Sequence, residues 1–389
     1  MGSQTGDANK GQSTYNPAML KRIYIDNFRC FVNFEYKPER KQLLLGANVS
    51  GKSSLLDAIR AVQGFVCEDG LDHFAQSTFK NGKTPWLNLP RQVFEIEAEL
   101  EGRQYVYRLE IQGETVPFAK VLLESLKVDG NPVIEHSEGA ALLFPDDPSS
   151  PEIRLGRDNS QSSILGSLRG FRKEAKTFVD WLSSDLICLI INPFAMRGIG
   201  KITGRLRPAI DMNDIADWYM SQTSNDIEGV FQLRASLQEA INGLASLNFK
   251  QLQPLGSGDL TISFNRIDGY PSYRLMELSE GQRCLVALYM ILHFLIAKGK
   301  TVFLDEPDNF LSLREIQPWL LAAEDAVEES KGQLILISHH PEILNYWARE
   351  YGLLFFREEN GHVRTKAYRE VAESGLDPAE TIARGWEDE

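Results

Sequence analysis

"GANVSGKSS", residues 46–54, matches the pattern GxxxxGK[ST] and stands between two apolar segments. The preceding "KQLLL" predicts a buried strand, and apolar residues every three or four positions afterwards predict a helix from Lys52 to about Val62. A glycine-rich turn between a strand and a helix N-terminus presents backbone N–H groups to a phosphate. The stretch therefore predicts a phosphate loop in an α/β fold, with a nucleoside triphosphate and Mg²⁺ as its ligands.

The residues of this loop have separate predicted tasks. Gly46 and Gly51 permit backbone conformations that other residues avoid, so successive N–H groups can surround the phosphates. Lys52 reaches the β- and γ-phosphates, and the Ser53 hydroxyl is a ligand for Mg²⁺. The predicted ATP contacts in this loop are Gly46, Asn48, Gly51, Lys52, Ser53 and Ser54.

"TVFLDEP", residues 301–307, predicts a second element of the same site. Its apolar half predicts a buried strand, and Asp305 then stands at the carboxyl end, where ligands bind in open α/β sheets. One carboxylate there can hold Mg²⁺, and a second, Glu306, can polarise an attacking water. The alternative is an acidic strand end that simply faces solvent.

"LSEGQR", residues 278–283, opens a long apolar helix. Ser279 and Gly281 offer a hydroxyl and exposed N–H groups to an anion at the helix N-terminus. The alternative is an ordinary N-cap, with Ser279 as the capping residue. The position favours a functional role, because Ser279 precedes Asp305 by 26 residues and "LISHHPE" follows on the next strand end.

Composition limits the class of protein. The net charge of −13 argues against a chain that coats nucleic acid over its whole surface, although it permits a local basic patch. The four cysteines lack CxxC spacing, which argues against a zinc site or a disulfide scaffold and indicates a reducing cytoplasm. The longest apolar run, residues 284–297, is shorter than the roughly 20 residues that a membrane span needs, and no signal peptide precedes it. We expect a cytoplasmic protein without a membrane partner.

Periodicity predicts the organisation of the chain. Strand and helix alternate at both ends, and these elements should form one parallel sheet. At the N-terminal end, alternating residues over 20–28 predict the first strand. Between the two ends, period-two segments from residue 92 to about 133 predict an antiparallel meander, and a polar linker follows. Two helical stretches come next, roughly 165–182 and 212–247, with an apolar strand at 186–191 between them. The predicted divisions are a disordered or artificial N-terminus (1–18), an N-terminal ATPase part (19–90), an inserted β and helical region (91–265), a C-terminal ATPase part (266–370) and an acidic tail (371–389).

The order of its motifs makes this chain resemble the ABC-type ATPases. That order is a phosphate loop, an LSxGQ-like signature, an apolar strand ending in Asp-Glu and then a histidine. "IDNFRCF" before the phosphate loop and the large insertion before the signature resemble the RecF/SMC/OLD branch. "DEPDNFLSLREIQPWL" and "ISHHPEIL" are similar to OLD-like ATPase domains of bacterial defence systems, without their Toprim nuclease domain. The resemblance covers residues 20–65 and 275–345 well and the middle only by layout.

The resemblance implies a role for each matching residue. Asp305 would hold Mg²⁺ with Ser53, Glu306 would be the general base, and His339 would sense the γ-phosphate, although His340 leaves that register ambiguous by one. The signature would contact ATP held by another subunit, so the site would be complete only in a head-to-tail homodimer or in a higher homo-oligomer of such dimers. The signature residues are Ser279, Gly281 and Gln282, the dimer-contacting loop contains Asp308, and the candidates for a metal-contacting glutamine are Gln92, Gln104, Gln112 and Asn192.

Family resemblance also suggests an output: ATP-driven dimerisation that regulates a separate effector protein from the same operon, in anti-phage defence. The alternative is a RecF-like ATPase that grips DNA when ATP is bound, and a transporter subunit is a third. Two basic clusters bear on the choice. Candidate contacts for nucleic acid or a partner are Arg197, Lys201, Arg205 and Arg207, while Arg169, Arg172, Lys173 and Lys176 are better interpreted as a solvated helix face.

Overall fold

The structure is a computed structural model, and it describes residues 18–67, 78–112, 120–137, 139–145, 151–156, 162–205, 207–252, 257–267, 269–370 and 377–383. The predicted N-terminal segment 1–18 therefore lies outside the described residues except for Ala18. The predicted acidic tail also lies outside them except for 377–383, which contains the short helix α10 (Pro378–Ala383).

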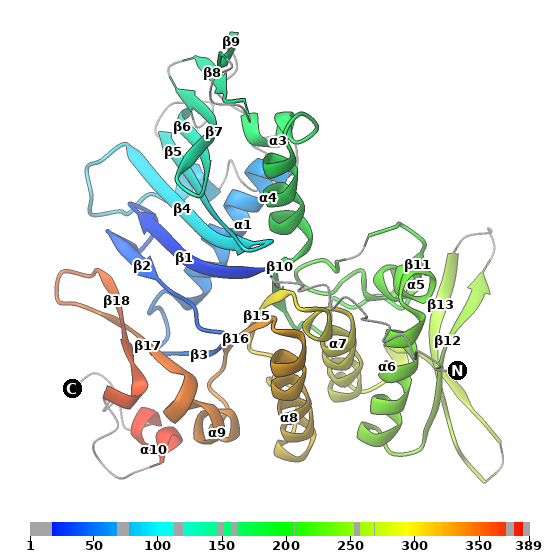
Figure 1. Ribbon diagram of the computed structural model, residues 1–389. Helices are drawn as coiled ribbons and strands as arrows, with labels where there is room; N and C mark the ends of the chain where they lie inside the picture. The colour runs from blue at the N-terminus through cyan, green and yellow to red at the C-terminus, as the bar shows by residue number, and fades with distance from the viewer. Residues whose placement is uncertain are drawn as a thin grey trace, which may run out of the picture.

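A six-stranded sheet forms the centre of the molecule, in the order β10-β15-β16-β3-β17-β18 (Figure 1). The first five strands are parallel, and β18 is antiparallel to β17. Their bounds are β3 Lys41–Leu45, β10 Leu186–Ile190, β15 Thr301–Asp305, β16 Gln333–Ile337, β17 Gly352–Arg357 and β18 Val363–Ala367.

An eight-stranded antiparallel sheet forms the upper lobe in Figure 1, in the order β2-β1-β4-β5-β6-β7-β8-β9. It contains the predicted meander. Its strands are β1 Met19–Asp26, β2 Phe34–Tyr36, β4 Arg91–Leu100, β5 Arg103–Gln112, β6 Lys120–Val128, β7 Asn131–Ser137, β8 Ala140–Leu143 and β9 Ile153–Gly156. A smaller sheet at the lower right contains β11 Ile199–Lys201, β12 Leu244–Leu252, β13 Ser257–Phe264 and β14 Ser272–Arg274.

The helices cover the two faces of the central sheet. On the side of the antiparallel sheet lie α1 Lys52–Cys67, α3 Ile164–Leu168 and α4 Lys173–Ser184. On the other side lie α5 Ile215–Asn225, α6 Ile227–Ala240, α7 Glu280–Phe294, α8 Leu313–Ser330 and α9 Pro341–Tyr351.

Strand β15 contributes side chains to two hydrophobic cores, one on each face of the central sheet. Phe303 is buried in the core shared with α1 and the antiparallel sheet, whereas Val302 and Leu304 are buried in the core shared with α5 to α9. Successive side chains of a strand point to opposite faces, so a continuous apolar run fills both cores at once. The mixed α/β fold agrees with the sequence prediction.

Two strands occupy sheets other than those predicted. β1 joins the antiparallel sheet between β2 and β4, and β10, from the predicted insertion, is an edge strand of the central sheet. The pattern of each strand explains its position. β1, "MLKRIYID", alternates as strands with one solvated face do, whereas β10, "LICLI", is apolar throughout, as strands covered on both faces are.

The predicted helix over 212–247 is also interrupted. It forms α5 and α6, which meet at Asp226, and the residues from Leu244 onward belong to β12. The Asp226 carboxylate accepts a hydrogen bond from the Gly229 N–H at 3.0 Å and so caps α6. An aspartate inside an apolar pattern was the sequence signal for this break.

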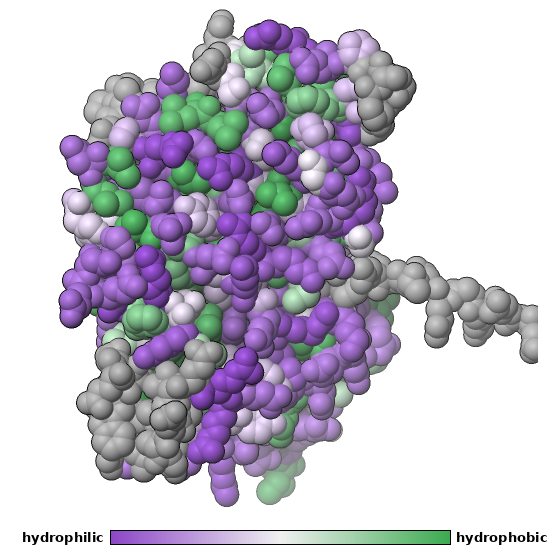
Figure 2. Space-filling model, turned by 60° about the vertical axis from the view of Figure 1, so that its left-hand side comes forward, coloured by the Kyte–Doolittle hydropathy of each residue, from purple (hydrophilic) through white to green (hydrophobic). Residues whose placement is uncertain are grey.

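Helix α7 is the most apolar helix of the central region. The stretch Glu280–Lys298 is long and apolar enough to cross a membrane by length and composition, but 72% of its most apolar window is buried inside the protein. We interpret it as a core helix. The face of the molecule in Figure 2 is mainly hydrophilic, with small and separate apolar patches.

Candidate functional site

The predicted phosphate loop connects β3 to α1. Gly46 has φ 130° and Gly51 has φ 112°, conformations that L-residues rarely adopt. A Cβ atom on Gly46 would lie 2.2 Å from the backbone oxygen of Phe355. Gly46 is therefore required where the loop passes β17, and Gly51 is required by its backbone conformation.

Lys52, the first residue of α1, is buried and turned back over the loop. Its Nζ donates to the backbone oxygens of Gly46 at 2.5 Å and Ala47 at 3.2 Å, and to the Ser50 hydroxyl at 3.3 Å. Burial lowers the pKa of Lys52, while the charges of Asp305 and Glu306 act in the opposite direction. The ammonium group is thus held by neutral oxygen acceptors. Phosphate oxygens at the same position would be stronger acceptors, because they are charged.

The carboxyl end of β15 brings Asp305 to the phosphate loop. The Ser53 hydroxyl donates to Oδ2 of Asp305 at 3.4 Å, although the two residues are far apart in the chain. Burial and then the charge of Glu306 raise the pKa of Asp305 to about 6. A hydroxyl beside a carboxylate that is unfavourably charged fits Mg²⁺, which binds hard oxygen ligands and neutralises such charge.

Glu306 and His339 complete the polar wall of the same cavity. Glu306 has φ 49°, and its Oε2 accepts a hydrogen bond from the Asn309 amide at 2.7 Å. His339 faces the cavity, and burial followed by the charge of Lys52 lowers its pKa. By contrast, Nδ1 of His340 accepts the Glu342 N–H at 3.3 Å and caps α9. The geometry therefore selects His339 as the histidine that faces the cavity.

The cavity has a volume of about 400 Å³ and contains residues that the sequence patterns did not indicate. Arg357, after β17, donates to the Val49 backbone oxygen from Nε at 3.0 Å and from Nη2 at 2.8 Å. Arg29 forms an ion pair with Asp57 of α1. The exposed Trp86 ring offers a flat apolar surface at the rim. Further lining residues without a sequence signal are Asn81, Lys83 and Pro85.

The signature stretch does not line this cavity. Ser279 is the exposed N-cap of α7, and its Oγ accepts the Gln282 N–H at 3.3 Å, while Oε1 of Gln282 accepts the Ser279 N–H at 3.2 Å. The capping interpretation is therefore confirmed as a structural fact. It does not conflict with a functional role, because the helix tip still faces outward.

Asp308 has a different setting from the one expected of a dimer contact. Its side chain is only 5% exposed, and burial raises its pKa. The neighbouring Asn309 and Phe310 are the exposed residues of this loop. A contact with another subunit would involve these neighbours before the Asp308 carboxylate.

The four candidates for the metal-contacting glutamine position lie in two different parts of the fold. Gln92, Gln104 and Gln112 belong to β4 and β5 of the antiparallel sheet. Asn192 follows β10, whose last residue, Ile190, is paired with Asp305. Of the four, Asn192 is the one at the carboxyl edge of the central sheet.

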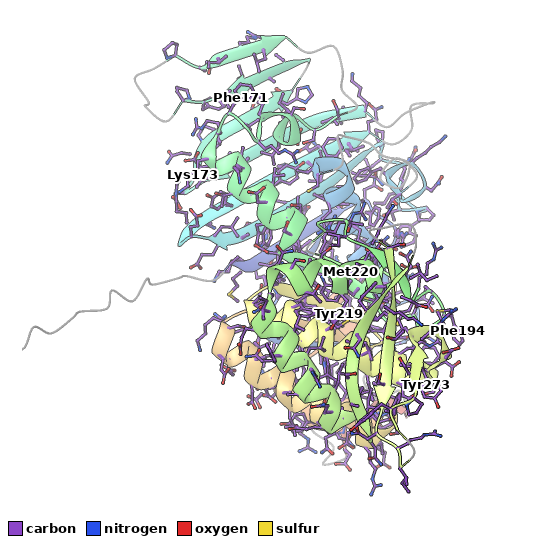
Figure 3. All side chains as sticks on the ribbon, turned by 90° about the vertical axis from the view of Figure 1, so that its right-hand side faces the viewer. Phe171, Lys173, Phe194, Tyr219, Met220 and Tyr273 are labelled. Atoms are coloured by element: carbon purple, nitrogen blue, oxygen red, sulfur yellow. The ribbon has the colours of Figure 1, made fainter. Side chains whose placement is uncertain are left out.

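The two basic clusters lie in different lobes. Figure 3 shows Lys173 in the upper lobe and Phe194, just before the first cluster, in the lower lobe. In the upper cluster, the ion pairs from Lys173 to Glu101 and from Lys176 to Asp180 are exposed, as on a solvated helix face. Arg172 differs from the prediction: its side chain is largely buried, pairs with Glu174 and donates to the Phe144 backbone oxygen. In the lower cluster, Arg197, Lys201 and Arg205 are exposed and Arg207 is partly buried, and of these Arg205 and Arg207 line a second cavity.

Comparisons with known proteins agree with this geometry. The fold and the phosphate loop define an ABC-type P-loop ATPase fold. The chain belongs to the family described as "AAA domain, putative AbiEii toxin, Type IV TA system", whose model matches residues 43–345. No curated protein matches the chain.

Solved structures show the same fold at low sequence identity. The SMC head bound to the C-winged helix domain of ScpA is 13% identical, with a TM-score of 0.57 over 90% of this chain and 99% of that chain. The Smc head domain with a coiled coil and joint from Pyrococcus yayanosii is 10% identical, with a TM-score of 0.53 over 95% and 100% of the two chains.

Proposed function

We propose that the chain binds Mg·ATP in the cavity beside the phosphate loop and hydrolyses the ATP. One observation carries this proposal: the phosphate loop after β3, the carboxylates at the end of β15 and His339 after β16 line a single cavity. These strands are neighbours in a parallel sheet, so their carboxyl ends meet at one edge.

Each polar residue has a proposed role in hydrolysis. Lys52 exchanges its loop carbonyl partners for the β- and γ-phosphates and stabilises their charge. Ser53 and Asp305 would hold Mg²⁺, which would supply charge neutralisation at the phosphates. Glu306 orients and deprotonates the attacking water, and His339 donates to the γ-phosphate.

The tip of α7 completes the site of a second subunit in a head-to-tail dimer. Ser279 is exposed and lies outside the lining of its own cavity, while the helix start offers N–H groups to an anion. ATP would then join two chains, and hydrolysis would release them.

The proposed output is the regulation of a separate effector protein in bacterial anti-phage defence. The family description names a toxin of a TA system, and one similar head structure is bound to a domain of another protein, ScpA. The head structure bound to ScpA supports a role that passes through a partner protein, while the family description connects such domains with a putative toxin of a Type IV TA system. In this proposal the chain supplies the ATP-dependent switch, and the partner protein supplies the toxic activity.

The test is Glu306→Gln. The variant should bind ATP as the parent does, because the amide is the same size, and should hydrolyse it about 10²- to 10³-fold more slowly because the base is removed. Nucleotide binding by calorimetry and phosphate release measure the two effects. ATP should also hold the variant as a dimer in size-exclusion chromatography.

The matched control is Glu315→Gln, which removes a carboxylate in the first turn of α8 outside the cavity. It should leave both binding and hydrolysis unchanged. Turnover of ATP by Glu306→Gln at the parent rate would overturn the catalytic assignment.

A further inference from the structure

A second cavity, of about 670 Å³, lies behind the phosphate-loop helix. Its walls are the C-terminal half of α1, the end of α4, β10 and residues 204, 205 and 207–210. A volume of this size matches the roughly 300–1,000 Å³ of sites that bind small molecules. The hydrolysis mechanism above uses none of its residues.

The charge of this cavity is unusual for so acidic a chain. Arg60, Arg205 and Arg207 line it, and no aspartate or glutamate is among the described lining residues, although Arg60 forms an ion pair at 3.3 Å with Asp57, which lies outside the lining. Burial raises the pKa of the Cys188 thiol to about 12, while the charges of Arg60 and Arg207 act in the opposite direction. Arg60 and Arg207, from two distant parts of the chain, thus line the same cavity as this thiol.

Backbone and amide bonds fix the walls. Nε2 of Gln63 donates to the Leu182 oxygen at 2.8 Å and to the Leu186 oxygen at 2.6 Å, which ties α1 to α4 and β10. The Ile190 N–H donates to the Ile210 oxygen at 2.7 Å and ties the 207–210 segment to β10. The site is preformed, so a ligand would not have to order it.

The cavity also has an apolar part, which is formed by Cys67, Ile187, Pro208, Ala209 and Ile210. A cationic part together with an apolar part suits a ligand that has both an anionic group and an organic body. Arginine binds phosphate with two parallel hydrogen bonds and is the preferred residue for that group.

We infer that this second cavity is a binding site for a phosphorylated small molecule of nucleotide size, separate from the phosphate-loop cavity. The phosphate binds Arg205 and Arg207 with Arg60, and the organic body packs against the apolar part. Nucleic acid shares the phosphate chemistry but is a different ligand, because Arg205 and Arg207 line this cavity, whereas Arg197 and Lys201 of the same segment are exposed outside its lining.

Cys67 provides a local reporter for the test. It lines the cavity and is partly exposed, whereas Cys30, Cys188 and Cys284 are buried, and the chain has four cysteines. The full chain is first saturated with a non-hydrolysable ATP analogue and Mg²⁺ to fill the phosphate loop. Inorganic pyrophosphate and AMP are then titrated as probes while the rate of maleimide labelling at Cys67 is followed by mass spectrometry.

Labelling should slow about tenfold at a probe concentration roughly ten times the dissociation constant. Arg205→Gln with Arg207→Gln should weaken probe binding roughly a hundredfold, about tenfold for each charge-assisted hydrogen bond that the substitutions remove. The charge-matched control is Arg197→Gln with Lys201→Gln, which should leave protection intact.

Two results would overturn the inference. The first is the absence of protection by either probe, or protection that survives in the Arg205 and Arg207 variant. The second is tight binding of single-stranded DNA that both double variants weaken equally, because the segment would then be a surface strip for a nucleic-acid backbone. Thermal unfolding of both variants near the parent temperature shows that the comparison concerns folded protein.

Discussion

In the phosphate-loop cavity, burial lowers the pKa of Lys52 and raises that of Asp305 to about 6, so both charges are costly without a ligand. At the tip of α7, by contrast, Ser279 and Gln282 satisfy each other's backbone N–H groups, and the residues lie near solvent. One region needs a ligand to relieve its electrostatics, and the other is stable without one. In the proposed mechanism, this difference assigns ATP affinity to the cavity and makes the helix tip contribute only after ATP is bound.

The largest predicted effect is on the cavity. Lys52→Ala should lower ATP affinity by roughly 10²- to 10³-fold, because it removes two charge-assisted bonds to phosphate. Calorimetric titration with ATP and Mg²⁺ measures the change. Thermal unfolding of the nucleotide-free variant should stay within a few degrees of the parent, since the lysine is held there only by loop acceptors.

The next effect is on the helix tip. Ser279→Glu places a carboxylate where the partner's phosphate would lie, while the helix dipole still tolerates the negative charge. ATP binding should be unchanged and hydrolysis should fall roughly a hundredfold, which is the effect of removing one anion-stabilising donor. The control Ile227→Glu adds the same charge at the exposed start of α6 and should hydrolyse ATP normally.

Mixing these variants tests the division between the two regions directly. A dimer of one Lys52→Ala chain and one Ser279→Glu chain has one site with both defects and one site with neither. Each variant alone is nearly inactive. Each mixed dimer should therefore recover up to about half of the parent rate of ATP hydrolysis. If mixtures stay as inactive as their components, the helix tip does not act on the other subunit.

The smallest predicted effect is on the stability of the fold. Removing a polar group should raise stability in the phosphate-loop cavity and lower it at the tip of α7. The pKa of Asp305 is raised from 3.8 to about 6 in the fold, so its stabilising contribution is present at low pH and is lost as pH rises through about 6. Asp305→Asn should raise the unfolding temperature of the Mg²⁺-free protein at pH 7.5 by roughly 2–4 °C and abolish Mg²⁺-dependent hydrolysis. At pH 5 the stability gain should shrink. Ser279→Ala, which removes a cap, should instead lower stability by about 1 kcal/mol.

The sequence predicted the parts of the site whose chemistry depends on a local pattern. The phosphate loop, the carboxylates after β15 and the cap of α7 each need a fixed spacing of residues, and all lie where the spacing placed them. Trp86 and Arg357 line the same cavity without a local pattern, because tertiary packing brings them there. The register of His339 likewise required the geometry of α9, since adjacent histidines are equivalent in a sequence.

The fold was predictable in class but not in the assignment of two strands. β1 and β10 were both predicted as strands. The strand that each one pairs with lies far away in the sequence, so the pairing could not be predicted from either segment alone. Their patterns, alternating in β1 and wholly apolar in β10, did contain the distinction between one solvated face and two covered ones.

The position of β3 in the central sheet has a consequence for biogenesis. Both neighbours of β3, β16 and β17, come from the C-terminal part of the chain, so the strand that anchors the phosphate loop has no partner while most of the protein is being synthesised. A nascent or truncated chain without β16 and β17 cannot be stabilised by a nucleotide. The phosphate loop is held in place only when these strands pair with β3, which makes the site form late in folding. Competence to bind ATP thus requires that translation has passed β16 and β17.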